Sequence, residues 1–226
     1  MKTRRDRILD VAISLAEAGG FDNVRQRDVA EQAGVALGTL YKAFRTKEDL
    51  LSAALERETQ LLEQRLELSP AKGKTGVDRV GSFFQLVTRG LCKKPRYARA
   101  VLRAMTSGEP EVTRNVVAYQ GRMNRLILAA LRGQGPISEA DVRRQPPSEE
   151  ESTLTLLLQQ LWFAELVAWS ASMLTPSQVI QHMHTAAEVL TRGLKGYQPR
   201  PARSVPAPVR NGSARPAPRR RRRPTA

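Results

Sequence analysis

The chain has 226 residues, 41% of them hydrophobic, which is enough to bury the core of one or two globular domains. Its formal net charge is +15, yet nine arginines and no acidic residue lie in 199–226, so overall basicity says little about the rest. The single Cys92 excludes an internal disulfide, and polar residues interrupt the most apolar run, 154–174, so no membrane span is expected. The N-terminus lacks a secretory signal pattern, and we expect a cytoplasmic protein.

Three short helices are expected first along the chain. Apolar residues at helical spacing predict a helix over 4–18, which the glycines that follow should end. A second helix is expected over 26–32, then a turn at Gly34, then a short helix over 37–44 with its Leu40 side buried. Two helices joined by a short glycine-containing turn are typical of a helix-turn-helix, whose second helix enters the DNA major groove.

A long helix is predicted over 47–68, with Thr46 as its N-cap, followed by a loop at 69–74. The pattern stays helical afterwards, and a polar stretch from Gly133 to Pro147 is expected to be a loop or a short extra turn. No segment alternates with the period of a strand, so the sequence predicts an all-α fold. The later helices are expected over 77–92, 96–105, 110–131, 149–173 and 176–194.

The C-terminal segment differs in composition from everything before it. Seven prolines and nine arginines occur in 199–226, with almost no large apolar side chain, and such a composition predicts disorder. The Arg219–Arg223 run has two interpretations: a basic tail that raises nonspecific DNA affinity, or a solubilising extension without a partner.

The pattern of the first sixty residues carries a family likeness. Residues 4–62 resemble the DNA-binding domain of the TetR family of bacterial regulators. The matching pieces are Ile8-Leu9-Asp10-Val11-Ala12, Gly20-Phe21, Asp28-Val29-Ala30, Ala33-Gly34-Val35, Gly38-Thr39-Leu40-Tyr41, Phe44 and Lys47-Glu48-Asp49-Leu50.

The resemblance implies three parts. A DNA-binding domain is expected over 2–62, with its helix-turn-helix at about 25–44. The long helix joins it to a helical ligand-binding and dimerisation domain over 63–196. The third part is the tail, 197–226. It also implies a homodimer that binds a palindromic operator in double-stranded DNA, most simply a repressor that a small hydrophobic effector releases. No cofactor, metal or membrane partner is expected, and the location is the bacterial cytoplasm, at the nucleoid when DNA is bound.

A second, weaker likeness is to the sterol-catabolism repressors of this family, which respond to acyl-CoA thioesters. It rests on Val24 to Ala30, on the turn Gly34-Val35-Ala36 and on Leu161 to Trp169. Two positions depart from the family pattern, which often has Thr or Ser where this chain has Arg25 and Ala36. Both positions cap helices and touch phosphate in many members, so we expect other groups to cap these helices here and the phosphate contacts at these two positions to differ.

The candidate DNA contacts lie in and beside the short third helix. An apolar Leu37 is placed where it can touch a thymine methyl, or it packs in the core. Gly38 permits close approach of the backbone to the sugar-phosphate, or is simply a flexible turn residue. Tyr41 and Lys47 are assigned to phosphate, with a core aromatic and a solvated lysine as the alternatives. The full set is Gln26, Arg27, Ala36, Leu37, Gly38, Thr39, Tyr41, Lys42 and Lys47.

The last two helices, 154–173 and 179–194, are expected to form a four-helix dimer interface, or else to fill the core of one subunit. For any single pocket candidate, ordinary core packing is favoured over a place in the pocket wall. The pocket candidates are Phe84, Leu102, Met105, Met123, Ile127, Trp162, Leu166 and Trp169, with Phe83, Leu126 and Phe163 beside them. His182 and His184 are two residues apart on a helix and do not share a face as a metal pair would.

Three rival functions were weighed against this one. An enzyme would need a nucleophile set, a phosphate loop or a metal cluster, and the sequence has none of these patterns. An architectural binder of DNA or RNA would use the arginine-rich tail and depend little on Tyr41 or Lys42. An activator would use the same helix-turn-helix, and sequence does not separate activation from repression.

Overall fold

The computed structural model describes residues 3–194, and every regular element in that range is a helix. The expectation of an all-α fold, with a helix-turn-helix domain joined to a helical C-terminal domain, is confirmed. The prediction of disorder for 197–226 concerns residues outside the described range.

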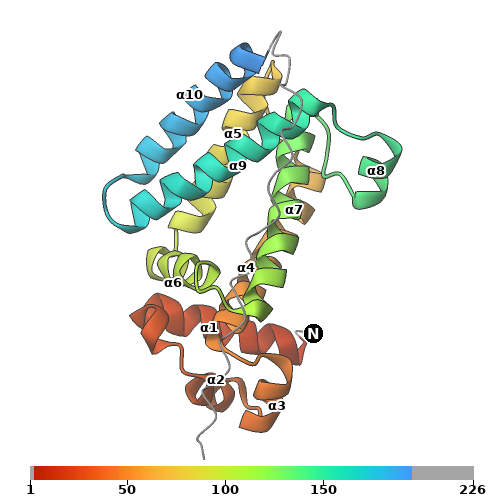
Figure 1. The fold of residues 1–226 in the computed structure, drawn as a ribbon. Helices are drawn as coiled ribbons and strands as arrows, with labels where there is room; N and C mark the ends of the chain where they lie inside the picture. The colour runs from red at the N-terminus through yellow and green to blue at the C-terminus, as the bar shows by residue number, and fades with distance from the viewer. Residues whose placement is uncertain (1–2, 195–226) are drawn as a thin grey trace, which may run out of the picture. The chain divides into compact units, whose positions relative to one another are not determined.

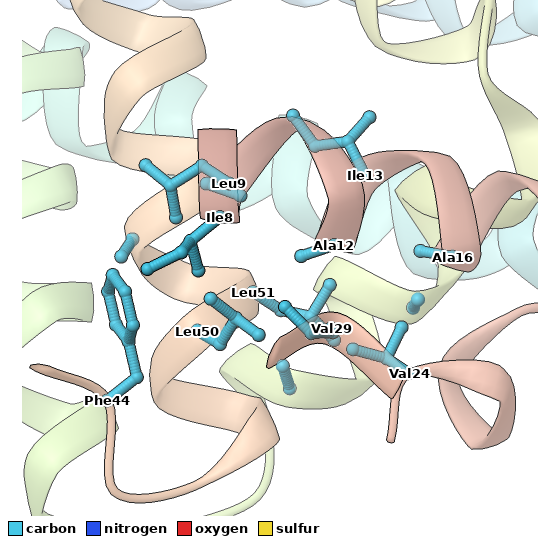
Figure 2. Packing of buried hydrophobic residues seen from close by; sticks show 14 of the residues in the cluster. Ile8, Leu9, Ala12, Ile13, Ala16, Val24, Val29, Phe44, Leu50 and Leu51 are labelled. Atoms are coloured by element: carbon cyan, nitrogen blue, oxygen red, sulfur yellow. The ribbon is translucent and has the colours of Figure 1, made fainter. Parts of the chain in front are cut away.

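The N-terminal helices are α1 (Arg4–Gly19), the short 3₁₀ helix η1 (Phe21–Asn23), α2 (Gln26–Ala33) and α3 (Leu37–Ala43). They pack with the start of α4 around one apolar cluster, here called the first core, in which side chains of α1 point toward α2 and α4 (Figure 2). Its members include Ile8, Leu9, Ala12, Val24, Val29, Leu40, Phe44, Leu50 and Leu51. The helical spacing of these residues in the sequence therefore predicted the buried face.

The turn between α2 and α3 is fixed by one backbone conformation and one side chain. Gly34 adopts φ 66°, in the left-handed region that glycine enters without strain. Val35, just beyond it, packs against the first core. The Gln26 side chain spans the two helices, because its Nε2 donates to the carbonyl oxygen of Phe44 at 2.9 Å. Gln26 thus joins the start of α2 to the end of α3.

Helix α4 (Lys47–Leu68) begins at Thr46, whose side chain accepts a hydrogen bond from the backbone N–H of Asp49 at 3.0 Å. The predicted cap and bounds are confirmed. The first half of α4 packs in the first core, and Leu66 near its end packs in a second apolar cluster, here called the second core. One uninterrupted helix therefore contributes to both cores.

The second core is built from the remaining helices. Figure 1 shows α5, α9 and α10 side by side, with α7 against α4 and α6 next to α1. The short helix α8 lies in the stretch for which a loop or a short turn was expected. The elements are α5 (Gly76–Cys92), α6 (Pro95–Met105), α7 (Pro110–Arg132), α8 (Glu139–Arg144), α9 (Glu149–Ser170) and α10 (Pro176–Leu194).

Arginines tie α4 to its neighbours on two sides. Arg57 of α4 contacts Asp10 of α1 at 2.7 Å. Arg122 of α7 contacts Glu56 of α4 at 2.6 Å and also pairs with Glu63. These groups are largely shielded from solvent, so each pair has a desolvation cost that the partner charge offsets. The pairs set the register of α4 against the helices on both sides.

A first prediction concerns the Gln26 bridge. Replacing Gln26 with Ala removes the hydrogen bond to Phe44 and should lower the free energy of unfolding by about 1 kcal/mol. Urea unfolding followed by circular dichroism measures this change. Gln32→Ala alters an exposed glutamine on the same helix and should stay within about 0.5 kcal/mol of the parent. Equal midpoints for the two variants would show that the bridge adds no stability.

Candidate functional site

Helix α3 exposes a leucine and a tyrosine, which are residue types that are usually buried. Leu40 and Phe44 fill the buried positions, while Leu37 and Tyr41 are 37% and 47% exposed. Lys42 is exposed beside them, and Thr39 is half-buried. Leu40 and Phe44, and not Leu37 and Tyr41, are therefore the side chains that pack in the first core here. An exposed apolar, phenolic and cationic set lies on one short helix.

The neighbouring backbone is also open. Ala36, Gly38 and Arg27 are exposed. A Cβ atom built on Gly38 would meet no atom within 4 Å, so packing in this chain does not require a glycine there. Neither Arg25 at the start of α2 nor Ala36 at the start of α3 provides a side-chain cap. Their first-turn N–H groups lack the cap that the family pattern often supplies, and an anion can approach them.

Two of the predicted contact residues have partners within the protein. The Gln26 amide is committed to Phe44, as described above. The Lys47 ammonium lies 3.7 Å from Asp22 Oδ1 and 4.0 Å from the centre of the Phe21 ring. Lys47 is therefore partly engaged by an acidic and an aromatic side chain of the protein itself. The spacing of residues in the sequence did not predict that Asp22 is its neighbour.

Helix α6 holds the N-terminal helices through polar contacts along its length. The Arg96 side chain donates to the carbonyl oxygen of Ala18 at 2.6 Å. The backbone N–H of Tyr97 donates to Glu17 Oε2 at 3.0 Å. Arg103 contacts Asp22 at 3.0 Å, and its guanidinium lies 4.2 Å from the Phe21 ring centre. Asp22 and Phe21 thus contact both α6 and the first residue of α4.

A cavity of about 580 Å³, here called the outer cavity, lies among α4, α5, α6 and α7. Its size is within the range of small-molecule sites. Four cationic residues, all solvent-exposed, belong to its lining together with Glu58. The cations are Arg65, Arg89, Lys93 and Lys94. Apolar side chains from α4, α5, α7 and α9 and a few neutral polar ones line the remainder, so the cavity combines charged and apolar groups.

A second cavity of about 30 Å³, here called the inner cavity, adjoins it. The two share four lining residues, Leu55, Leu91, Tyr119 and Trp162. The inner cavity is lined mostly by apolar side chains, chiefly of α6 and α9 and also of α4, α5 and α7, and holds about the volume of one water molecule. A larger molecule can enter it only if part of this wall moves.

The predicted pocket residues divide between the cavities and the core. The inner cavity is lined by Leu102, Met105, Trp162 and Leu166, and also by Phe163. Met123 and Trp162 line the outer cavity. The side chains that lie in the second core without lining either cavity are Phe84, Ile127 and Trp169. Phe83 and Leu126 line a small separate cavity of about 10 Å³.

Sequence reasoning missed the polar lining. The four cations come from α4, from α5 and from the segment that leads into α6, and no local pattern joins them. Burial raises the pKa of the Cys92 thiol to about 11, so the thiol stays protonated at neutral pH. Burial also raises the pKa values of the Tyr97 and Tyr119 hydroxyls, which stay neutral. Charge at the cavities therefore comes from the cations and Glu58.

The leucine cluster at the start of α9 is split between two environments. Leu154 and Leu158 are buried in the second core, while Leu156 and Leu157 are exposed, and Val167 further along α9 is exposed as well. On α10, Val179, Met183 and Ala187 pack inward, and the outward face is mostly polar. The unpartnered apolar surface thus belongs mainly to α9.

Two further searches concern residues 3–194. No helix there is long and apolar enough to cross a membrane. Within the same range, no three His, Cys, Asp or Glu side chains are grouped so as to hold a metal ion.

Comparison with known proteins gives a consistent result along the chain. Residues 8–54 match the model of bacterial regulatory proteins of the tetR family, and residues 73–190 match the tetracyclin repressor-like C-terminal domain. The chain is 30% identical over 189 residues to the HTH-type transcriptional repressor KstR of Rhodococcus jostii (strain RHA1), which covers 84% of this chain and 83% of the relative.

Solved structures share the fold. A TetR transcriptional regulator from Rhodococcus sp. RHA1 matches with a TM-score of 0.71 and 24% identity, over 83% of this chain and 94% of that one. The TetR family transcriptional repressor FadR of Thermus thermophilus, solved with lauroyl-CoA, matches with a TM-score of 0.59 and 21% identity, over 90% and 98%.

The resemblances to the TetR family and to its sterol-catabolism repressors, seen first in the sequence, are confirmed. The exposed α3 surface and the two family matches agree, and none of them indicates catalysis. The chain belongs to the TetR family of bacterial regulatory proteins and is a DNA-binding helix-turn-helix transcriptional regulator, not an enzyme.

Proposed function

We propose that the protein is a repressor that binds a palindromic operator as a homodimer and is released by an amphipathic, anionic effector of the acyl-CoA type. The DNA-binding part would be residues 2–62, and residues 63–196 would bind the effector and form the dimer. The observation that carries the proposal is the pair of adjoining cavities, one with four cations in its lining and the other lined mostly by apolar side chains, with α6 in its wall.

The DNA contacts would divide by chemistry. Leu37 is exposed early in α3, where an apolar side chain can meet a thymine methyl. Tyr41 and Lys42 project from the same exposed surface and suit phosphate oxygens. Arg27 and the uncapped start of α2 add positive charge beside them. One module of this size offers few base contacts, which favours a dimer on two half-sites.

The dimer would be formed by α9, with α10 at its side. Exposed Leu156, Leu157 and Val167 are apolar side chains that the protein's own core does not use. Burial against a second copy would remove this surface from water, and a two-fold interface pairs the same patch on both subunits. Such a dimer would also place two copies of α3 at the fixed separation that an operator needs.

The effector would be held by both cavities at once. Phosphate or carboxylate groups suit the exposed Arg65, Arg89, Lys93 and Lys94, while an acyl chain suits the apolar passage past Tyr119 and Trp162. The FadR structure solved with lauroyl-CoA shows that this fold accommodates a ligand of that class in another protein, and it supports the same class here.

Release would follow from the narrowness of the inner cavity. A chain that enters a space of about 30 Å³ would have to displace part of its wall, and α6 would be the part that moves. Helix α6 is attached to the N-terminal helices through Arg96, Tyr97 and Arg103. Its displacement would therefore shift the DNA-binding part, and a ligand that prefers the displaced state lowers operator affinity.

The operator is tested by incubating the purified full-length protein with genomic fragments near physiological salt and sequencing those retained. A short palindromic motif is expected. Lys42→Ala should weaken binding to that motif and reduce the salt slope by about 1, the value for one lost phosphate contact. Lys72→Ala, an exposed lysine in the loop after α4, should change neither quantity. Enrichment without a motif would contradict operator reading.

The dimer is tested by sedimentation velocity at micromolar concentration. The parent protein should sediment as a dimer, and Leu157→Glu should give monomers because the interface would bury an unpaired carboxylate. Val117→Glu introduces the same charge at an exposed apolar position on α7 and should remain dimeric. A monomeric parent protein would rule out the proposed interface.

The coupling through α6 is tested with Arg103→Ala. Dodecanoyl-CoA should bind this variant as it binds the parent, while the loss of operator affinity that it causes should shrink by about threefold. Arg143→Ala is the control, because it removes an exposed arginine of α8 and leaves the contacts of α6 with α9 and with the N-terminal helices unchanged. Fluorescence anisotropy of labelled operator measures both. Equal coupling in the two variants would argue against this route.

A further inference from the structure

Gln159 is a polar side chain within the apolar part of the cavities. It lies on α9, is 5% exposed and lines the inner cavity. Its neighbours in that wall include Leu102 and Met105 of α6 and Leu166 of α9. Within residues 3–194, no protein group donates a hydrogen bond to its Oε1 atom, which is itself fully buried.

Two nearby polar groups differ from each other in whether they have a partner. Trp162, one turn away on the same helix, donates from Nε1 to Thr88 Oγ1 at 2.9 Å, so its polar atom is satisfied within the protein. Tyr97 lines the outer cavity and, like Gln159, is buried with a hydroxyl that no protein group pairs in the described range. Buried polar atoms are nearly always paired, and an unpaired one on a side chain that lines a cavity points to a group that arrives there.

We propose that Gln159 recognises a hydroxyl or keto oxygen carried on the apolar part of the effector. The inference rests on the proposed effector site and specifies its ligand further. In the observed orientation the amide presents an acceptor, which suits a hydroxyl donor. Rotation of the amide by a half-turn presents the NH₂ group instead, which suits a carbonyl oxygen.

Gln159 would select against a plain hydrocarbon chain. The inner cavity has room for about one water molecule, which an entering chain displaces. A methylene in that place leaves the amide covered by hydrocarbon and without a partner, which disfavours binding. An oxygen on the chain would supply the hydrogen-bond partner that the amide oxygen lacks within the described protein. Cations at the outer cavity and an amide at the inner one would thus read the two ends of one ligand.

The test compares dodecanoyl-CoA with a set of hydroxy- and keto-dodecanoyl-CoA thioesters in which the oxygen is moved along the chain. Calorimetric titration of the full-length protein should show one position that binds about tenfold more tightly than the plain chain, the worth of one net hydrogen bond. Gln159→Leu should abolish that preference and bind dodecanoyl-CoA at least as tightly as the parent. Gln181→Leu, at an exposed glutamine on α10, should keep the preference.

Thermal unfolding without ligand separates recognition from a structural role. Gln159→Leu should unfold at the same or a higher temperature than the parent, because it removes an unpaired buried acceptor. A lower unfolding temperature would overturn the proposal, as would a parent protein with no preference at any position. If no thioester binds, the acyl-CoA proposal fails by itself, and the corresponding free acids test Gln159. Failure of these acids to bind would overturn the Gln159 proposal as well.

Discussion

The burial of one helix in two cores constrains the rest of this structure. Leu50 and Leu51 of α4 pack with the N-terminal helices, and Leu66, four turns later, packs with the C-terminal ones. Because an α-helix transmits displacement along its axis with little bending, neither core can rotate far without the other. Arg57 toward α1 and Arg122 toward α7 hold α4 on both sides. The DNA-binding part is therefore connected to the cavity-bearing part through a shared, packed helix and not through a flexible linker.

Helix α6 is a second connection and differs from α4 in what surrounds it. It packs in both cores, yet Leu102 and Met105 face the inner cavity, where the opposing wall is not in full contact. A helix that is close-packed on all sides resists displacement, whereas a helix that borders a cavity can shift into the empty space. Regulation through α6 is consistent with this contrast, and Asp22 contacts both Arg103 of α6 and Lys47 at the start of α4.

The cavities lower the free energy of unfolding, so the residues that line them are better explained by ligand binding than by stability. Empty volume and an unpaired amide at Gln159 both cost folding free energy, and a protein selected for stability alone would fill the space with a leucine. Features that disfavour the empty protein would become favourable with the proposed anionic, partly apolar ligand bound, as expected of a sensor.

The sequence by itself determined the helices and the helix-turn-helix, because periodicity, caps and left-handed glycines act over a few residues. Thr46 and Gly34 are examples, and the family likeness added the proposal that the exposed side of α3 contacts DNA. Only the tertiary structure decided which apolar side chains meet a cavity. Phe84 and Ile127 are as apolar as Trp162 and Leu166, yet they lie in the core, since a helical period tells which face is buried and not which neighbour covers it. Contacts such as Arg103 with Asp22 join residues far apart in the chain, where no local signal reaches.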